Sequence, residues 1–231
     1  KPHPAPAPPG DKPSCPASFL GYACSAPTET AGVVLHWSTS GAMPANDCTR
    51  SAPGLPRDGM LHFAISSESS GMLGVGFPSS PGRMLHSDLA MGWVSDSGVA
   101  MAGAWSVPEG NYFYMRPDNT ATWADFVAVS ETTAAGVTRT VVCFSRRLEN
   151  SAASTVLPTL DVSRDVDLIY AVGPQQYSFD MVHRVDGALA VNLGSGGAGG
   201  AAWLTRQEKL YIHAVLMSIA WLVLLPVGAL L

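Results

Sequence analysis

Residues 72–94, MLGVGFPSSPGRMLHSDLAMGWV, carry the pattern that decides the fold. Two short apolar runs, 72–77 and 88–94, flank a cluster of proline, serine and glycine at 78–82 that is typical of a turn. Similar runs follow one another along the chain, at 33–38, 60–65, 99–105, 112–115, 123–131, 137–144, 166–172 and 188–193. About ten short strands with no helical period between them predict an all-β antiparallel sandwich or barrel.

Composition limits the partners that this chain can have. Of its 231 residues, 47% are hydrophobic and 13% are charged, and the formal net charge is -5. A chain this apolar and this long can bury a core, so it is not a disordered polyelectrolyte. Because nucleic-acid binding requires a dense basic surface, we expect no nucleic-acid partner.

The C-terminal residues differ in kind from the rest. Residues 210–231, LYIHAVLMSIAWLVLLPVGALL, contain no Asp, Glu, Lys or Arg. A helix of this length, at about 1.5 Å per residue, crosses the roughly 30 Å hydrocarbon core of a bilayer. The alternative is a buried core helix, but a globular helix normally keeps a polar stripe. We therefore predict a single transmembrane helix at 206–231.

The remaining sequence divides into three parts. A Pro/Ala-rich leader at 1–28 precedes the strand-rich domain at 29–193, and a flexible Gly-rich tether follows at 194–205. The chain opens at Lys1 and ends without the basic flank that normally follows a membrane span. We therefore expect a processed start and a longer membrane protein from which this chain is the first part.

Four cysteines, Cys15, Cys24, Cys48 and Cys143, bear on the compartment. None has zinc-site spacing, and an even count ahead of a membrane span favours two disulfides in an oxidising compartment. Three pairings are open, and four free thiols are the alternative. We expect the β-domain to be extracellular or lumenal, although Arg206 and Lys209 favour the opposite orientation under the positive-inside rule.

Two segments supply side chains that bind soft metals. The first contains Met84, His86 and Met91, and the second contains Met181 and His183. A thioether and an imidazole together suit the iron of an electron-transfer haem. The alternative is structural, because methionines near strands usually pack in cores and a single histidine is usually a surface or hydrogen-bonded residue. The sequence contains no G-x-S-x-G, H-E-x-x-H, P-loop or EF-hand motif, and we assign the G-x-G-x-x-G match at Gly194, Gly196 and Gly199 to linker composition.

The order of these motifs resembles two protein families. Residues 29–193 resemble DOMON domains at the following positions: GVGF at 74–77, Met84, Ser87-Asp88, Gly92-Trp93, CFSRRL at 143–148, IYAVG at 169–173, His183 with Gly187, and VNL at 191–193. The C-terminal helix is similar to the first core helix of the cytochrome b561 family, in His213, LMSIAW and Leu225-Pro226-x-Gly228. It departs from that family in Ala214, where glycine is frequent.

The DOMON resemblance implies an immunoglobulin-like sandwich with one b-type haem, held by Met84 and His183. His86 and Met91 are alternative ligands if the register differs. Phe77, Tyr170 and Arg146 are candidate pocket residues, with Trp93 and Arg147 as further candidates. Each of these has a structural alternative, which is core packing for the aromatic residues and an ion pair with an aspartate for the arginines. The b561 resemblance makes His213 a candidate ligand of a membrane haem in the longer protein.

The expected function is electron transfer between a transmembrane cytochrome b in the same protein and an outside partner. That partner would be ascorbate, a ferric chelate or a redox protein. The module would then belong to a transmembrane oxidoreductase of the ferric-reductase kind. The alternative is a haem-free recognition module that binds a sugar, a small aromatic molecule or a protein, with the helix as its anchor. A structural surface protein is a third reading of the Ala/Ser/Gly/Pro-rich composition.

Overall fold

The computed structural model describes most of the strand-rich domain. The described residues are 15–39, 59–80, 82–107, 116–117, 123–133, 135–148, 160–173, 184–196 and 198–200. The chain divides between Ala201 and Ala202 into two units, and all described residues belong to the first.

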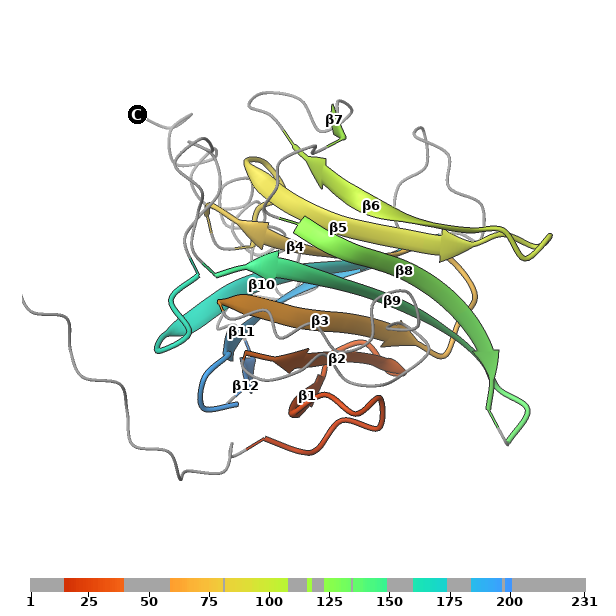
Figure 1. Ribbon diagram of the computed structural model, residues 1–231, viewed down its shortest axis with the longest axis horizontal. Helices are drawn as coiled ribbons and strands as arrows, with labels where there is room; N and C mark the ends of the chain where they lie inside the picture. Colours follow the sequence, from red (N-terminus) through yellow and green to blue (C-terminus); the bar gives the residue numbers. More distant parts are fainter. Residues whose placement is uncertain are drawn as a thin grey trace, which may run out of the picture. The chain divides into compact units, whose positions relative to one another are not determined.

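Two antiparallel sheets form the domain (Figure 1). The five-stranded sheet has the order β1 (Cys24–Pro27), β2 (Val33–Ser38), β3 (Met60–Ser67), β9 (Thr138–Arg147), β8 (Trp123–Thr132). The seven-stranded sheet has the order β12 (Ala198–Gly200), β11 (Val185–Asn192), β10 (Asp165–Val172), β4 (Leu73–Pro78), β5 (Ser87–Val94), β6 (Ala100–Ser106), β7 (Arg116–Pro117). The predicted all-β antiparallel sandwich is confirmed.

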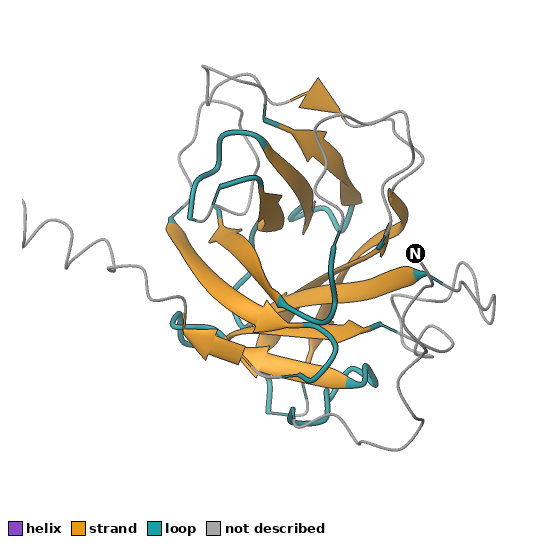
Figure 2. Ribbon diagram, turned by 90° about the vertical axis from the view of Figure 1, so that its left-hand side faces the viewer, coloured by secondary structure: helices purple, strands orange, loops and turns teal. Residues whose placement is uncertain are grey.

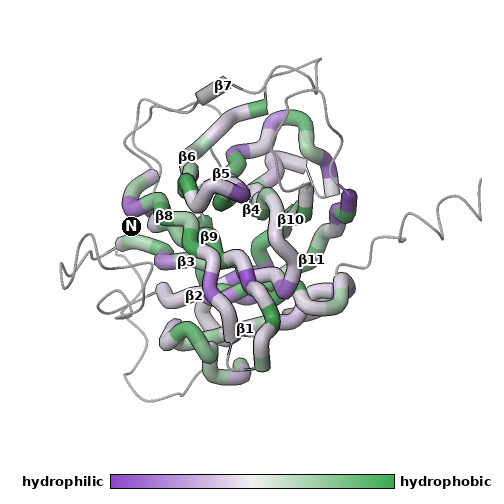
Figure 3. Tube along the Cα trace, turned by 90° about the vertical axis from the view of Figure 1, so that its right-hand side faces the viewer, coloured by the Kyte–Doolittle hydropathy of each residue, from purple (hydrophilic) through white to green (hydrophobic). Residues whose placement is uncertain are grey.

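The interior lies between the sheets and follows from side-chain alternation. In β4, Leu73, Val75 and Phe77 point inward, because successive side chains of a strand face opposite sides. They share one hydrophobic core with side chains of other strands, which are Leu35, Trp37, Leu61, Phe63, Ile65, Val142, Phe144, Leu168, Tyr170 and Val191. Hydrophobic stretches occur on strands of both sheets (Figure 3).

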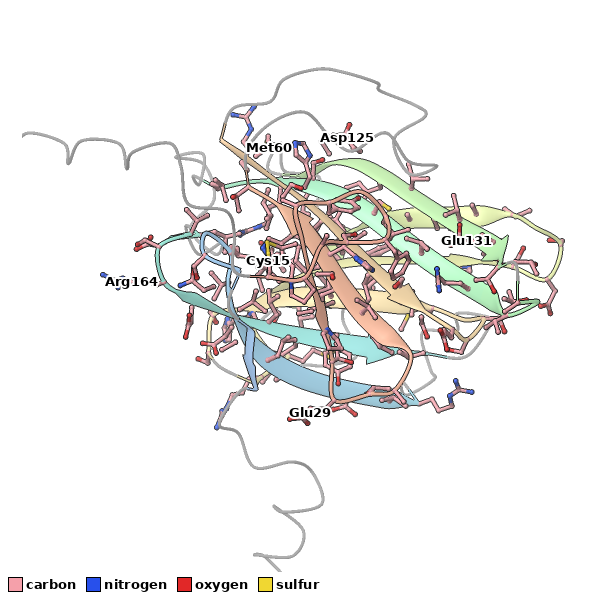
Figure 4. All side chains as sticks on the ribbon, turned by 90° about the horizontal axis from the view of Figure 1, so that it is seen from below. Cys15, Glu29, Met60, Asp125, Glu131 and Arg164 are labelled. Atoms are coloured by element: carbon pink, nitrogen blue, oxygen red, sulfur yellow. A yellow bond between two sulfur atoms is a disulfide. The ribbon has the colours of Figure 1, made fainter. Side chains whose placement is uncertain are left out.

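The N-terminal boundary of the folded domain differs from the prediction. The leader was expected to extend to residue 28, but β1 pairs with β2 and adds an edge strand to the five-stranded sheet. Cys15 and Cys24 form a disulfide that fastens the preceding segment to β1 (Figure 4). The four residues of β1, CSAP, include a proline and show no clear alternation, so the pattern did not indicate a strand.

The C-terminal boundary differs in a similar way. The tether was expected to start at residue 194, yet β12 pairs with β11 through Ala198–Gly200. Gly196 has φ +82 and packs against the Cys15–Cys24 disulfide, where a side chain would collide with the sulfur of Cys15. Its glycine-rich composition gave this stretch the appearance of a linker. The first part of the predicted tether is therefore a folded edge of the sheet.

The disulfide prediction can be compared with the structure directly. Cys15 pairs with Cys24, and Cys143 is disulfide-bonded as well. This selects one of the three pairings that the sequence left open. No cysteine among the described residues is a free thiol.

Strands and loops account for all of the described structure (Figure 2). Within the described ranges, no helix is long and apolar enough to cross a membrane. The predicted transmembrane helix at 206–231 lies outside those ranges.

The outer face of the five-stranded sheet buries a histidine. His36 is fully buried, and the hydroxyls of Ser18 and Ser66 hydrogen-bond to its Nδ1 and Nε2 at 2.9 and 3.0 Å. The ring of Phe19 packs edge-on against its imidazole at 4.7 Å. Burial, aided by the positive charge of Arg139, lowers the pKa of His36 from 6.5 to about 3.

Folding stability should therefore fall as the pH falls. Below pH 6.5, His36 binds a proton in the unfolded chain but stays neutral in the folded domain. The free energy of unfolding should therefore drop by about 1.4 kcal/mol per pH unit between pH 6 and 4. Urea unfolding of the full chain at pH 7, 6, 5 and 4 measures this slope. His36→Gln should remove most of it. An equal slope in both proteins would show that other groups cause it.

Candidate functional site

Met84 lies in the connection between β4 and β5 and is half-buried. It packs against an apolar cluster on the outer face of the seven-stranded sheet, and we call this group the outer cluster. Its buried members are Met72, Leu89, Met91 and Val107. Met84 is one of its partly buried members, and the others are Leu85, Trp93, Trp105 and Ile169. The predicted methionine thus joins an apolar surface of two other methionines and two tryptophans.

Two glycines form the floor beneath this cluster. A Cβ on Gly76 would lie 2.5 Å from Leu89 Cδ2 and 2.8 Å from Ile169 Cγ1, and one on Gly74 would lie 3.0 Å from Met91 Cγ. The missing side chains let Leu89, Ile169 and Met91 lie directly against the backbone of β4. The result is a closely packed apolar layer on the outer side of β4.

The alternative ligands occupy different positions. Met91 is only 5% exposed and belongs to the outer cluster, so its thioether lies on the same face as Met84. His86 has φ +56, in the left-handed region that disfavours side chains, and its N–H donates to Val107 O at 3.0 Å. Its imidazole is half-buried.

The three candidate pocket residues face the other side of the sheets. Phe77 is 1% exposed and its ring lies 6.3 Å from that of Phe63, within the interior. Tyr170 is also buried there, and its hydroxyl hydrogen-bonds with Thr30 Oγ1 at 3.0 Å. The structure therefore does not bring Phe77 and Tyr170 together with Met84, and core packing accounts for both. Their role in a pocket remains a prediction.

Arg146 also points into the interior, where it crosses from one sheet to the other. Its Nη2 lies 3.4 Å from Asp88 Oδ2, and both side chains are 1% exposed. The guanidinium lies 4.6 Å from the ring centre of Phe77 and 5.5 Å from that of Trp123. The aspartate ion pair that the sequence offered as an alternative is present, whereas Arg147 is exposed. Asp88 is the partner that the pattern alone could not identify.

His183, Met181 and His213 lie outside the described residues. The residue after His183 is described, and its N–H fixes its place in the sheet. The N–H of Arg184 donates to Val172 O at 2.8 Å, and Val172 pairs with Leu73 at the start of β4. Met84 follows the opposite end of β4, beyond Pro78.

Charged groups border the outer cluster on the β10 side. Asp167 shares a face of β10 with Ile169, because the two positions are separated by one residue. Partial burial, with a contribution from the nearby charge of Asp165, raises the pKa of Asp167. Among the described residues no group of three or more His, Cys, Asp or Glu side chains is arranged to hold a metal ion.

Comparison with known proteins gives a fold likeness. No protein-family model matches the sequence, and no curated protein sequence matches it. The structure is similar to the crystal structure of the cytochrome b domain of pyranose dehydrogenase from Coprinopsis cinerea, with a TM-score of 0.51 and 12% sequence identity. The match covers 87% of this chain and 94% of that chain. At this identity the likeness shows a common fold alone.

Proposed function

We propose that this chain is a b-type haem-binding electron-transfer module of the DOMON type. The observation that carries the proposal is the position of Met84, half-buried on an apolar cluster with a glycine floor. The likeness in fold to a cytochrome b domain supports it. Met84 and His183 are the residues that would hold the haem iron.

The chain segments next to the two proposed ligands lie at opposite ends of β4. Met84 follows the end of β4, and Arg184, next to His183, lies beside its start. The six residues of β4 span roughly 17 Å at about 3.3 Å per residue. Met84 packs on the outer face of the sheet with Met91, Leu89 and Ile169, which cover Gly74 and Gly76.

The chemistry would be electron transfer alone. A haem held by methionine and histidine has a raised reduction potential and no open coordination position. The outer cluster would contact the ring and exclude water from it, and Met84 would supply the thioether. The buried Arg146–Asp88 pair would support β5 from the interior face.

The setting of the module is part of the proposal. The disulfides at Cys15–Cys24 and Cys143 support an extracellular or lumenal location, because such bonds persist in oxidising compartments. We propose a transmembrane cytochrome b in the same protein as one redox partner. Ascorbate, a ferric chelate or a redox protein would be the other. This arrangement would make the module part of a transmembrane oxidoreductase.

The visible spectrum of the full chain, with haem added during purification, tests the function. Reduction with dithionite should produce the sharp α-band of low-spin haem. Met84→Ala and His183→Ala should each lose that band, since a low-spin haem needs both ligands. Met101→Ala is the matched control, because Met101 lies on β6 and is 52% exposed. A wild-type chain that takes up no haem would contradict the proposal.

A further inference from the structure

The hydroxyl of Ser87 reaches the backbone just before Met84. Ser87 is 1% exposed, and its Oγ donates to Arg83 O at 2.9 Å. That carbonyl belongs to the peptide group that joins Arg83 to Met84. The bond therefore restrains the plane of this peptide group, which contains the Cα atom of Met84.

Backbone hydrogen bonds hold the same turn from its other side. The N–H of His86 donates to Val107 O at 3.0 Å, and the N–H of Val107 donates to Ser87 O at 3.0 Å. These two bonds fasten the turn to the end of β6. We call the set of Arg83, His86, Ser87 and Val107 the clamp.

The turn needs such restraint because its backbone is unfavourable by itself. Gly82 has φ +65 and His86 has φ +56, so Met84 lies between two left-handed residues. For His86 this conformation costs free energy that surrounding contacts must offset. Of the bonds in the clamp, only that of Ser87 comes from a side chain, and it can therefore be removed by substitution without altering the backbone.

We propose that Ser87 is the positioning residue for Met84, holding the Arg83–Met84 peptide group so that the thioether stays at the haem iron. This inference rests on the proposed function. A methionine side chain has three rotatable bonds and does not fix its own direction, so the position of its backbone decides whether the sulfur meets the iron. Groups that orient a metal ligand typically change metal affinity by about 10–100-fold when they are removed.

Carbon monoxide measures how firmly the methionine is held. It binds ferrous haem only when Met84 has left the iron, so its apparent affinity rises by the factor by which methionine ligation weakens. In the haem-loaded full chain, Ser87→Ala should raise that affinity by about tenfold or more. Ser87→Thr, which keeps the hydroxyl, should stay near the wild type. In a Met84→Ala background, Ser87→Ala should have no further effect.

Ser95 supplies the matched control. It follows the other end of β5, where its Oγ accepts the N–H of Val99 at 3.0 Å. Ser95→Ala therefore removes a comparable bond far from Met84 and should leave carbon monoxide affinity unchanged. If Ser87→Ala fails to fold, Ser87→Cys, which keeps the size with only a weak donor, should shift the affinity in the same direction.

The outcomes separate this inference from the function on which it rests. A wild-type chain without haem would overturn both. A wild-type chain with methionine-ligated haem, in which Ser87→Ala leaves carbon monoxide affinity unchanged, would overturn the role of Ser87 alone. Hydrogen exchange of the haem-free chain gives a second readout. In Ser87→Ala the amide of His86 should exchange faster, and unchanged protection there would contradict the clamp.

Discussion

Replacing Asp88 with alanine should destabilise the folded domain by about 3–5 kcal/mol, as expected for breaking a buried ion pair from one side. Asp88 and Arg146 are each 1% exposed, and they join β5 of one sheet to β9 of the other. The alanine variant would leave the guanidinium buried without this carboxylate. The cost comes from the buried charge that remains, more than from the attraction that is lost.

Replacing both partners distinguishes the cost of the buried charge that remains from the loss of the attraction. Asp88→Leu combined with Arg146→Met puts apolar side chains of similar volume between Phe77 and Trp123, whose rings flank the guanidinium. The double variant should be more stable than Asp88→Ala, because it removes both buried charges. Urea unfolding of the full chain measures both free energies.

An exposed ion pair provides the control for this experiment. Arg164 Nε lies 3.2 Å from Asp161 Oδ2, and their side chains are 81% and 52% exposed. Figure 4 shows Arg164 directed away from the sandwich. Solvent screens such a pair, so Arg164→Ala, which keeps the hydrogen bonds from Ser163 to Asp161 Oδ1, should change stability little. If Asp88→Ala were equally mild, the buried pair would contribute nothing that depends on its burial.

The sequence predicted the class of fold and most strands, because alternation and turn residues are local signals. The runs at 72–77 and 88–94 show little alternation, and this feature is itself informative. Strands that are buried on both faces read as continuous apolar runs, and β4 and β5 are covered on both. Leu73 and Phe77 belong to the interior, whereas Leu89 and Met91 belong to the outer cluster.

The candidate site was predictable in part. Met84 could be identified from its residue type and its motif, and the structure places it on the outer cluster. The DOMON resemblance made Phe77 a candidate pocket residue, although it alternates in step with Leu73 and Val75, which face the core. The partner of Arg146 is 58 residues away in sequence, and no local pattern specifies such a distant contact. The strands β1 and β12 were not predicted, because they are short and contain proline or glycine, which do not indicate a strand.

Trp37→Ala should also destabilise the domain by about 3–5 kcal/mol, the usual cost of removing a buried large aromatic side chain. Trp37 lies in β2 and is fully buried in the interior. Its Nε1 donates to Leu193 O at 3.2 Å, across 156 positions of sequence. Leu193 directly follows β11, so this bond ties the five-stranded sheet to the end of a strand in the other sheet.

Trp37→Phe separates the two contributions of this side chain. Phenylalanine keeps most of the apolar contact but cannot donate to Leu193 O, so its cost should be about 1–3 kcal/mol, the range for a buried acceptor left without its partner. Hydrogen exchange locates the effect. The amide of Gly194, which donates to Val162 O at 2.9 Å, should lose protection in Trp37→Phe if the bond holds the chain where it leaves β11. Unchanged protection at Gly194 would mean that Trp37 stabilises the core without fixing this exit. The segment that continues to β12 would then depend on Gly196 and the disulfide beneath it.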